Sequence, residues 1–292
     1  MGTSTIPVDL LNPGQVLACV GFLEAAEQLC GKARGGFQWD DDHETSARFV
    51  LESEREDPVS SVLEFMACAD ISELAPDGWN PKKRDAVALY RTGDRFPAHE
   101  PNETSLPIVL INRGIEVQMG HWTDGTNRDE FKLYSGNRSA FTIASVQIAG
   151  KLNAKGDIDI PGVAQLWEQD CEALVRDPFG VTIPMGGSFN MDARCAWSAI
   201  DAGYSPNSHS HQRVMGSPVV EIMAAWGLEN TRPHLLVRRH YRYAVWRDPL
   251  PPLLARPMLS GAFGAFKHRL FSFKLEMSGK NKIIQYAEEE RG

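Results

Sequence analysis

Residues 6–31, IPVDLLNPGQVLACVGFLEAAEQLCG, carry a strand pattern that passes directly into a helix pattern. The residues at the start predict a short strand over Ile6 to Leu10. Asn12 is a residue type that caps helices, and Pro13 suits the first helical position. The apolar residues that follow recur at helical spacing, and Gly31 is a residue type that ends helices. We therefore predict a strand followed at once by one long, capped helix.

Strand and helix patterns continue to interleave along the rest of the chain. Residues 48–53 predict a strand, and residues 106–111 and 115–122 predict a hairpin around Asn112-Arg113-Gly114. Helical spacing is found in residues 58–66, 140–149, 163–175, 193–202 and 217–227. Residues 151–162 are interpreted as a linker or loop, and the proline-rich residues 249–257 as irregular structure.

This order of elements predicts the fold class. The strict alternation of strands and helices that characterises doubly wound folds is absent from the pattern. We predict an α+β fold with a mostly antiparallel mixed sheet and several packed helices. The chain divides into an N-terminal α+β part over 1–150 and a C-terminal part over 151–292 that is helical and then basic β. These parts form either two domains or one continuous domain.

The composition is that of a globular protein. The 292 residues are 42% apolar, which is enough to fill a core, and no run of about 18 apolar residues exists to cross a bilayer. The first residues, MGTSTIPVDLLNPG, lack the pattern of a signal peptide. The five cysteines include no Cys-x-x-Cys pair and indicate free thiols in a reducing compartment. We expect a cytoplasmic protein with no membrane contact.

Charge is distributed unevenly along the chain. The net charge is −8, yet residues 232–282 hold eleven Lys or Arg against two acids, a balance of +9. Such asymmetry is typical of a polyanion-binding face on an acidic body. The alternative is that the basic segment docks on the acidic stretch at 40–73, and composition alone does not separate the two interpretations.

The basic region is interpreted as two paired strands. In residues 235–248, LLVRRHYRYAVWRD, one continuous strand would place Arg238, His240, Arg242 and Trp246 on one face, and Tyr241 and Tyr243 on the other. Residues 265–277, AFKHRLFSFKLEM, form the partner strand. Basic residues interleaved with aromatics match a groove that tracks a nucleic-acid backbone, although aromatics on the opposite face are commonly core. The candidate contacts are Arg238, Arg239, Arg242, Lys267, Arg269 and Lys274. Arg239 falls on the face opposite Arg238.

A second candidate is the polar elbow in residues 131–145, FKLYSGNRSAFTIAS. Phosphates are held by basic side chains, by backbone N–H groups and by helix N-termini, and this elbow offers all three. We take Lys132, Asn137 and Arg138 as candidate contacts. The simpler alternative is a turn capped by Ser139 with a solvated arginine.

Catalytic signals are weak. The sequence contains no Gly-x-Ser-x-Gly elbow, P-loop, dinucleotide fingerprint or His-Glu-x-x-His helix. His209 and His211, with Asp201 upstream, would make a metal-dependent nuclease or hydrolase, but a polar surface loop explains them as well. Asp192 is better explained as a helix cap. We predict a protein that is not an enzyme and has no catalytic residue, metal or cofactor.

Four motifs together resemble a known family. They lie in residues 6–29, 131–145, 189–207 (FNMDARCAWSAIDAGYSPN) and 218–233 (PVVEIMAAWGLENTRP), and the similarity continues to GKNKIIQYAEEE at 279–290. In this order they resemble the Csb family of subtype I-U (I-G) CRISPR-Cas systems, in particular its Cascade large-subunit-like member.

The resemblance implies a non-catalytic subunit of an RNA-guided surveillance complex in antiviral defence. In such complexes the guide RNA reads the target by pairing, while protein subunits read a short flanking motif and hold backbones. The implied partners are other Cascade subunits, guide RNA, target DNA and the helicase-nuclease effector. A scaffold that binds only proteins remains an alternative.

Overall fold

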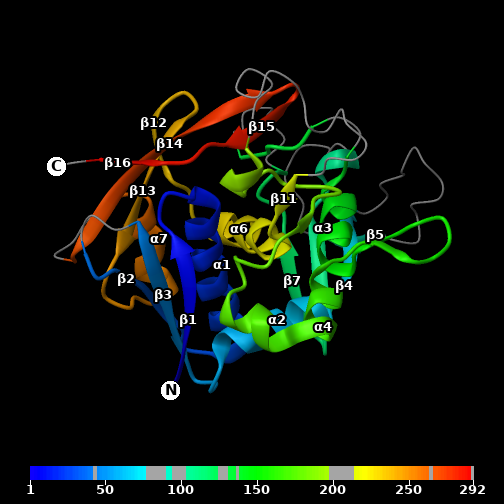
Figure 1. Cartoon of the computed structure of the whole chain (residues 1–292), viewed down its shortest axis with the longest axis horizontal. Coiled ribbons are helices and arrows are strands. Elements are labelled where there is room, and N and C mark those ends of the chain that lie inside the picture. Colours follow the sequence, from blue (N-terminus) through cyan, green and yellow to red (C-terminus); the bar gives the residue numbers. More distant parts are fainter. Residues whose placement is uncertain are drawn as a thin grey trace.

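The described part of the chain has an α+β architecture (Figure 1). The computed structural model describes residues 1–41, 45–76, 90–93, 103–123, 131–135, 138–196, 214–262 and 266–290. Within these residues lie six α-helices and several sheets, in which all strand pairs but one are antiparallel. The predicted fold class is therefore confirmed.

The first unit contains the predicted strand and long helix. Its elements are β1 (Gly2–Asp9), α1 (Pro13–Cys30), β2 (Arg34–Gln38), β3 (Ser46–Ser53) and α2 (Pro58–Ala67). The three strands form one antiparallel sheet in the order β1-β3-β2. The Asn12 side chain accepts from Gly14 N–H, and the Asp57 side chain accepts from Ser60 N–H. Both helices thus begin where the capping signals predict.

A second sheet follows α2. Its strands are β4 (Asp70–Pro76), β5 (Tyr90–Gly93), β6 (Ile108–Asn112) and β7 (Ile115–Met119), in the order β5-β4-β6-β7, with a short 3-10 helix η2 (Glu103–Ser105) before β6. Only the β4–β5 pair is parallel. The predicted hairpin is confirmed, because Arg113 and Gly114 both have positive φ, as a type I′ turn requires.

The middle of the chain is mostly helical. It contains α3 (Ala140–Ala149), β8 (Lys151–Leu152), β9 (Ile158–Ile160), α4 (Val163–Arg176), β10 (Ile183–Pro184), the 3-10 helix η3 (Ala193–Cys195), β11 (Met215–Gly216) and α6 (Pro218–Asn230). The stretch predicted as a linker or loop at 151–162 contains two short strands, since β8 and β9 pair as a small hairpin around a loop at 153–157. The helix predicted over 193–202 is described only to residue 196, where it is the single turn η3; the rest lies outside the described residues.

The last unit is a five-stranded sheet with one helix. It contains β12 (His234–Val237), β13 (His240–Trp246), α7 (Pro252–Leu259), β14 (His268–Ser278), β15 (Asn281–Ile284) and β16 (Glu288–Glu289). The order is β12-β13-β14-β15, and β16 also pairs with β14.

Two predictions for this unit are wrong. Residues 235–248 are not one strand, because a turn at Arg238–Arg239, with Arg239 at φ 62°, separates β12 from β13. The proline-rich stretch forms α7, since Pro252 stands in the first turn, where its missing N–H costs no hydrogen bond.

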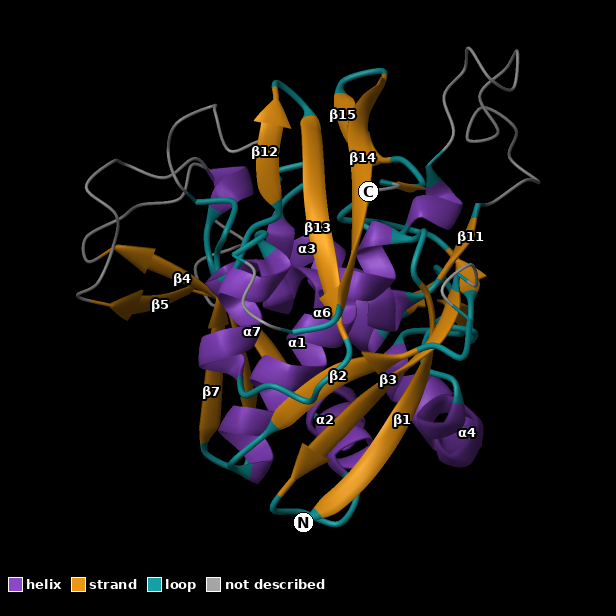
Figure 2. Ribbon diagram, turned by 90° about the vertical axis from the view of Figure 1, so that its left-hand side faces the viewer, coloured by secondary structure: helices purple, strands orange, loops and turns teal. Residues whose placement is uncertain are grey.

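One core joins the two halves of the sequence. Helices α1 and α6 cross closely at Gly21. A Cβ at this position would lie only 1.9 Å from the carbonyl oxygen of Met223, so no side chain fits there. Around these helices, Phe37 of β2 packs edge-on against Trp246 of β13 with ring centroids 5.4 Å apart. Figure 2 shows α1 and α6 between the β1-β3-β2 sheet and the β12–β15 strands. No helix in the described part is long and apolar enough to cross a membrane.

Candidate nucleic-acid interface

The β14–β15 hairpin presents different side chains on its two faces. Ser278 pairs with Asn281, and Met277 pairs with Lys282, around a tight turn in which Gly279 has φ 63°. Directly opposed residues in an antiparallel pair share a face. Asn281 therefore lies on the same face of the hairpin as Ser278, and Lys282 lies on the opposite face.

The elbow predicted to bind phosphate lies beside this hairpin. Lys282 N–H donates to the Leu133 carbonyl at 2.9 Å, and both the N–H and the hydroxyl of Ser135 donate to Asn281 Oδ1, each at 2.9 Å. Ser139 caps α3 by accepting from Thr142 N–H at 3.1 Å, as predicted. Asn137 lies outside the described residues. Two stretches that sequence analysis treated separately are thus neighbours.

Two lysines meet on one face of the hairpin. The Lys132 ammonium lies 4.4 Å from the centroid of the Tyr134 ring. Burial lowers the pKa of Lys132, and the nearby charge of Lys282 lowers it further. A bound anion would oppose both effects, because it favours the charged form of the amine. The two lysines therefore give this face of the hairpin local positive charge.

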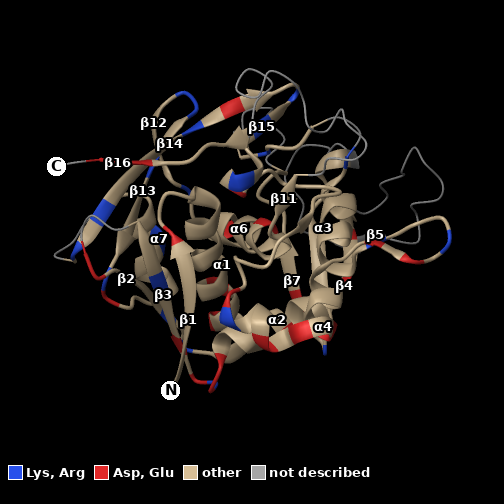
Figure 3. Cartoon of the chain, in the orientation of Figure 1, with Lys and Arg blue, Asp and Glu red and all other residues tan. Residues whose placement is uncertain are grey.

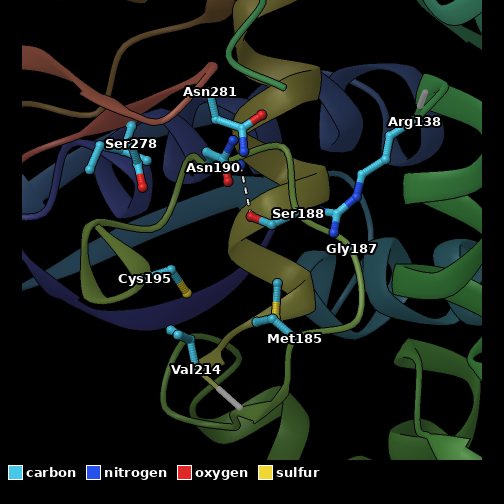
Figure 4. Close-up of a pocket in the computed structure, with 10 residues that line it drawn as sticks. Arg138, Met185, Gly187, Ser188, Asn190, Cys195, Val214, Ser278 and Asn281 are labelled. Carbon is cyan, nitrogen blue, oxygen red and sulfur yellow. Dashed lines mark hydrogen bonds between the residues drawn. The ribbon is translucent and has the colours of Figure 1, made fainter. Parts of the chain in front are cut away.

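A polar pocket opens on the other face. Its volume is about 290 Å³, and its polar lining comes from the elbow, from the segment before η3 and from the hairpin: Arg138, Ser188, Asn190, Ser278 and Asn281. Met185, Gly187, Cys195, Val214 and Ile283 complete it. Figure 4 shows the Arg138 side chain reaching across toward the Gly187–Ser188 segment. The elbow arginine is thus part of a defined cavity.

The wall opposite Arg138 is held by buried groups. Asn190 adopts φ 64°, and its N–H donates to Ser188 Oγ at 2.8 Å. Behind it, Glu221 of α6 accepts from the N–H groups of Met191 and Asp192 at 3.2 and 3.0 Å. Burial raises the pKa of Glu221 to about 7. This carboxyl group therefore positions the backbone of the wall.

Asp192 has a structural role, as the cap prediction required. Its carboxylate accepts from Arg194 N–H at 3.1 Å, from the Arg194 guanidinium at 2.6 Å and from the Asn12 amide at 2.9 Å. Burial and nearby carboxylates raise the pKa of the Cys195 thiol far above its usual range, so this thiol stays protonated at neutral pH. Neither residue has the properties of a catalytic group.

The metal-dependent alternative concerns residues outside the described part. His209, His211 and Asp201 all lie between 197 and 213. Among the residues that the structure describes, no group of three His, Cys, Asp or Glu is arranged to hold a metal ion.

The other four predicted contacts lie in the β12–β13 turn, in β14 or directly before β14: Arg238, Arg239, Lys267 and Lys274. Leu275 N–H donates to the Arg239 carbonyl at 2.9 Å, which places the β12–β13 turn, with exposed Arg238, beside β14. Lys274 is exposed opposite His240, and exposed Lys267 lies 6.0 Å from the Trp39 ring. Figure 3 shows Lys and Arg at the β12–β13 turn and at the far end of β14–β15, and Asp and Glu over α2 and α4.

Arg242 and Arg269 are already paired with acids. Arg242 lies 2.7 Å from Glu290, and Arg269 is only 7% exposed, with both its Nε and an amino group on the Glu289 carboxylate at 2.6 and 2.8 Å. These partners come from β16 and the residue after it. The prediction missed them, although the run Glu288–Glu290 is visible in the sequence. We therefore assign buried Arg269 to the fold, whereas Arg242, with its side chain 32% exposed, stays a predicted contact.

The predicted stacking surface is also corrected. Tyr241, Tyr243 and Trp246 are all buried in the core. Tyr241 and Tyr243 pack against the phenylalanines of β14, and Trp246 donates to the Gly35 carbonyl at 2.8 Å. Nucleic-acid bases therefore have no access to these rings in this structure.

Comparisons with known proteins identify no family. No protein-family model, no curated protein and no solved structure matches the chain. The geometry around β14–β15 is therefore the basis for the functional proposal, together with the sequence resemblance described above.

Proposed function

We propose that this chain is a non-catalytic subunit of a type I CRISPR surveillance complex and holds the backbone of guide RNA or target DNA. The contact surface is the basic tip, which we define as Lys132 and Lys282 on one face of the β14–β15 hairpin, Arg138 at the pocket on the other face, and exposed Lys280 in the turn. The observation that carries the proposal is the meeting of the elbow and the β14–β15 hairpin around one polar pocket. The resemblance to the Csb family is the reason for proposing this type of complex.

The charge arrangement supports this role. Basic side chains that neutralise phosphates release counterions, and this release favours binding to any nucleic-acid sequence. Lys132 and Lys282 stand close enough for one to lower the pKa of the other, so a polyanion is the ligand that this pair favours. In the complex, base pairing by the guide supplies the sequence recognition that such contacts lack.

The proposal includes the setting in which the chain works. The complex is cytoplasmic, and the chain binds other Cascade subunits and presents a surface to the helicase-nuclease effector. The acidic surface over α2 and α4 lies away from the basic tip and is the face left for protein neighbours (Figure 3).

A pull-down from the native host tests the proposal. The tagged wild-type chain should recover short repeat-derived RNA together with other CRISPR-associated subunits. The double variant Lys132→Glu/Lys282→Glu should keep the protein partners and lose most of the RNA.

The matched control is Lys32→Glu, beyond the far end of α1. Helix α1 has 18 residues and is therefore about 27 Å long. Lys32 follows its C-terminus, whereas Asn12 precedes its N-terminus and contacts Asp192 near the pocket. A wild-type chain without RNA and without such partners would reject the function. Unchanged RNA recovery by the double variant would reject the basic tip. Recovery of protein partners without RNA by the wild type would favour a scaffold.

A further inference from the structure

The shape of the pocket beside Arg138 indicates a ligand other than a continuous nucleic-acid backbone. Its volume of about 290 Å³ is just below the usual range for small-ligand sites, about 300–1,000 Å³. A continuous nucleic-acid backbone needs an open groove. This cavity instead has two facing walls, one that begins at Ser188 and one on the β14–β15 hairpin (Figure 4). Its size suits one nucleotide turned out of a strand.

The lining offers the chemistry that one nucleotide needs. Arg138 presents a planar fork of donors that fits a phosphate. Asn190 and Asn281 have side-chain amides, which combine donors and acceptors as the edges of bases do, and Ser188 and Ser278 add hydroxyls. Met185, Val214 and Ile283 supply apolar surface for a flat ring.

The polar groups are oriented in advance. Asn281 Oδ1 is occupied by two donors of Ser135, so the amide nitrogen is the end of this side chain that remains for a ligand. Asn190 adopts φ 64°, a left-handed conformation that asparagine tolerates well, and its N–H is fixed by Ser188 Oγ at 2.8 Å. The hydrogen bonds of Glu221 fix the backbone that follows. Orientation before binding reduces the entropy cost of binding.

We infer that this pocket binds a single unpaired nucleotide, with its phosphate on Arg138 and its base edge on the amides of Asn190 and Asn281. The inference rests on the proposed function and adds to it a contact that depends on the base. Single-stranded nucleic acid is recognised in this way, by bases that are turned out and hydrogen-bonded at their edges.

Asn190→Gly tests this contact, because glycine adopts φ 64° without strain and the variant lacks the side chain that carries the amide. Binding of the full-length chain to 12-nucleotide RNA homopolymers of A, C and U and to a 12-residue abasic ribose-phosphate oligomer is measured by fluorescence anisotropy. The wild type should bind at least one RNA about tenfold more tightly than the abasic oligomer. Asn190→Gly should abolish this difference and leave the salt dependence unchanged, whereas Lys32→Gln should alter neither.

The outcomes separate the two proposals. Equal affinity of the wild type for RNA and abasic oligomer, or an unchanged preference in Asn190→Gly, overturns the nucleotide pocket and leaves backbone binding intact. A wild-type chain that binds none of the oligomers contradicts the proposed function as well. Thermal unfolding of each variant confirms that the fold is retained.

Discussion

Asn281 and Ser135, which lie 146 residues apart in sequence, share two hydrogen bonds at 2.9 Å that both end on Asn281 Oδ1. These bonds join the β14–β15 hairpin to the elbow and fix the direction of the Asn281 amide at the pocket wall. Asn281 therefore holds the elbow and the hairpin together and also presents its amide nitrogen to the proposed ligand.

Substitutions of Asn281 should separate these two roles. Asn281→Asp keeps an acceptor for Ser135 but places a negative charge in the pocket, so RNA affinity should fall by more than about tenfold with little change in stability. Asn281→Leu leaves Ser135 N–H without its acceptor and should lower the free energy of unfolding by about 1–3 kcal/mol. Anisotropy and chemical denaturation measure the two effects. Equal RNA affinity of wild type and Asn281→Asp would contradict the placement of a phosphate or base in this pocket.

RNA binding should be coupled to protonation of Lys132. Burial and Lys282 lower the pKa of this amine in the unbound chain, and a bound phosphate raises it. RNA binding should therefore take up protons and weaken as pH rises through the pKa of the unbound chain. Titration calorimetry in two buffers of different ionisation enthalpy measures this uptake. Lys132→Met should show weaker binding with less proton uptake, and identical uptake in the variant would assign the effect to another group.

Glu221 should make stability depend on pH. Burial raises its pKa from the usual 4.5 to about 7, so the folded state binds this proton more tightly than the unfolded state. The contribution of Glu221 to stability is therefore present below pH 4.5 and is lost as pH rises to 7.

Glu221→Gln keeps an oxygen for the N–H groups of Met191 and Asp192 and removes the charge. Above pH 7 the variant should be the more stable protein, by an amount on the order of 3 kcal/mol, and the difference should shrink toward pH 4.5. Denaturation curves of both proteins across this range measure the difference. A constant difference would contradict titration of Glu221 in this window.

Arg269 should affect stability and leave RNA binding unchanged. Its buried guanidinium pairs with Glu289, so Glu289→Ala removes a carboxylate from a buried charge and should lower the free energy of unfolding by about 3–5 kcal/mol. Under conditions where the variant is folded, the salt dependence of RNA binding should match that of the wild type. A steeper salt dependence, as the released guanidinium would give by contacting a phosphate, would return Arg269 to the interface.

The local parts of the fold were predictable from the sequence because their signals are local. Asn12 and Asp57 cap the helices that they precede, and Asn112-Arg113-Gly114 is a dependable hairpin signal. The turn at Arg238–Arg239 was missed because neither residue is a turn former, and Arg239 adopts a positive φ that usually indicates glycine or asparagine.

The candidate site was predictable only in part. The charge run and the elbow identified Lys132 and Arg138, but their arrangement depends on contacts between residues far apart in sequence, such as Ser135 with Asn281. The pairing of Glu289 with Arg269 is of the same kind. A single sequence shows which charges exist, and only the fold shows which of them are already paired.

The salt dependence of RNA affinity tests the basic tip most directly. The logarithm of the binding constant of a single strand falls with the logarithm of salt concentration by about 0.7 per phosphate contact. Arg138→Gln/Lys282→Gln should therefore reduce the slope by about 1.4 relative to the wild type, while Lys32→Gln leaves it unchanged. A slope in the double variant equal to that of the wild type would show that nucleic acid binds elsewhere on the chain.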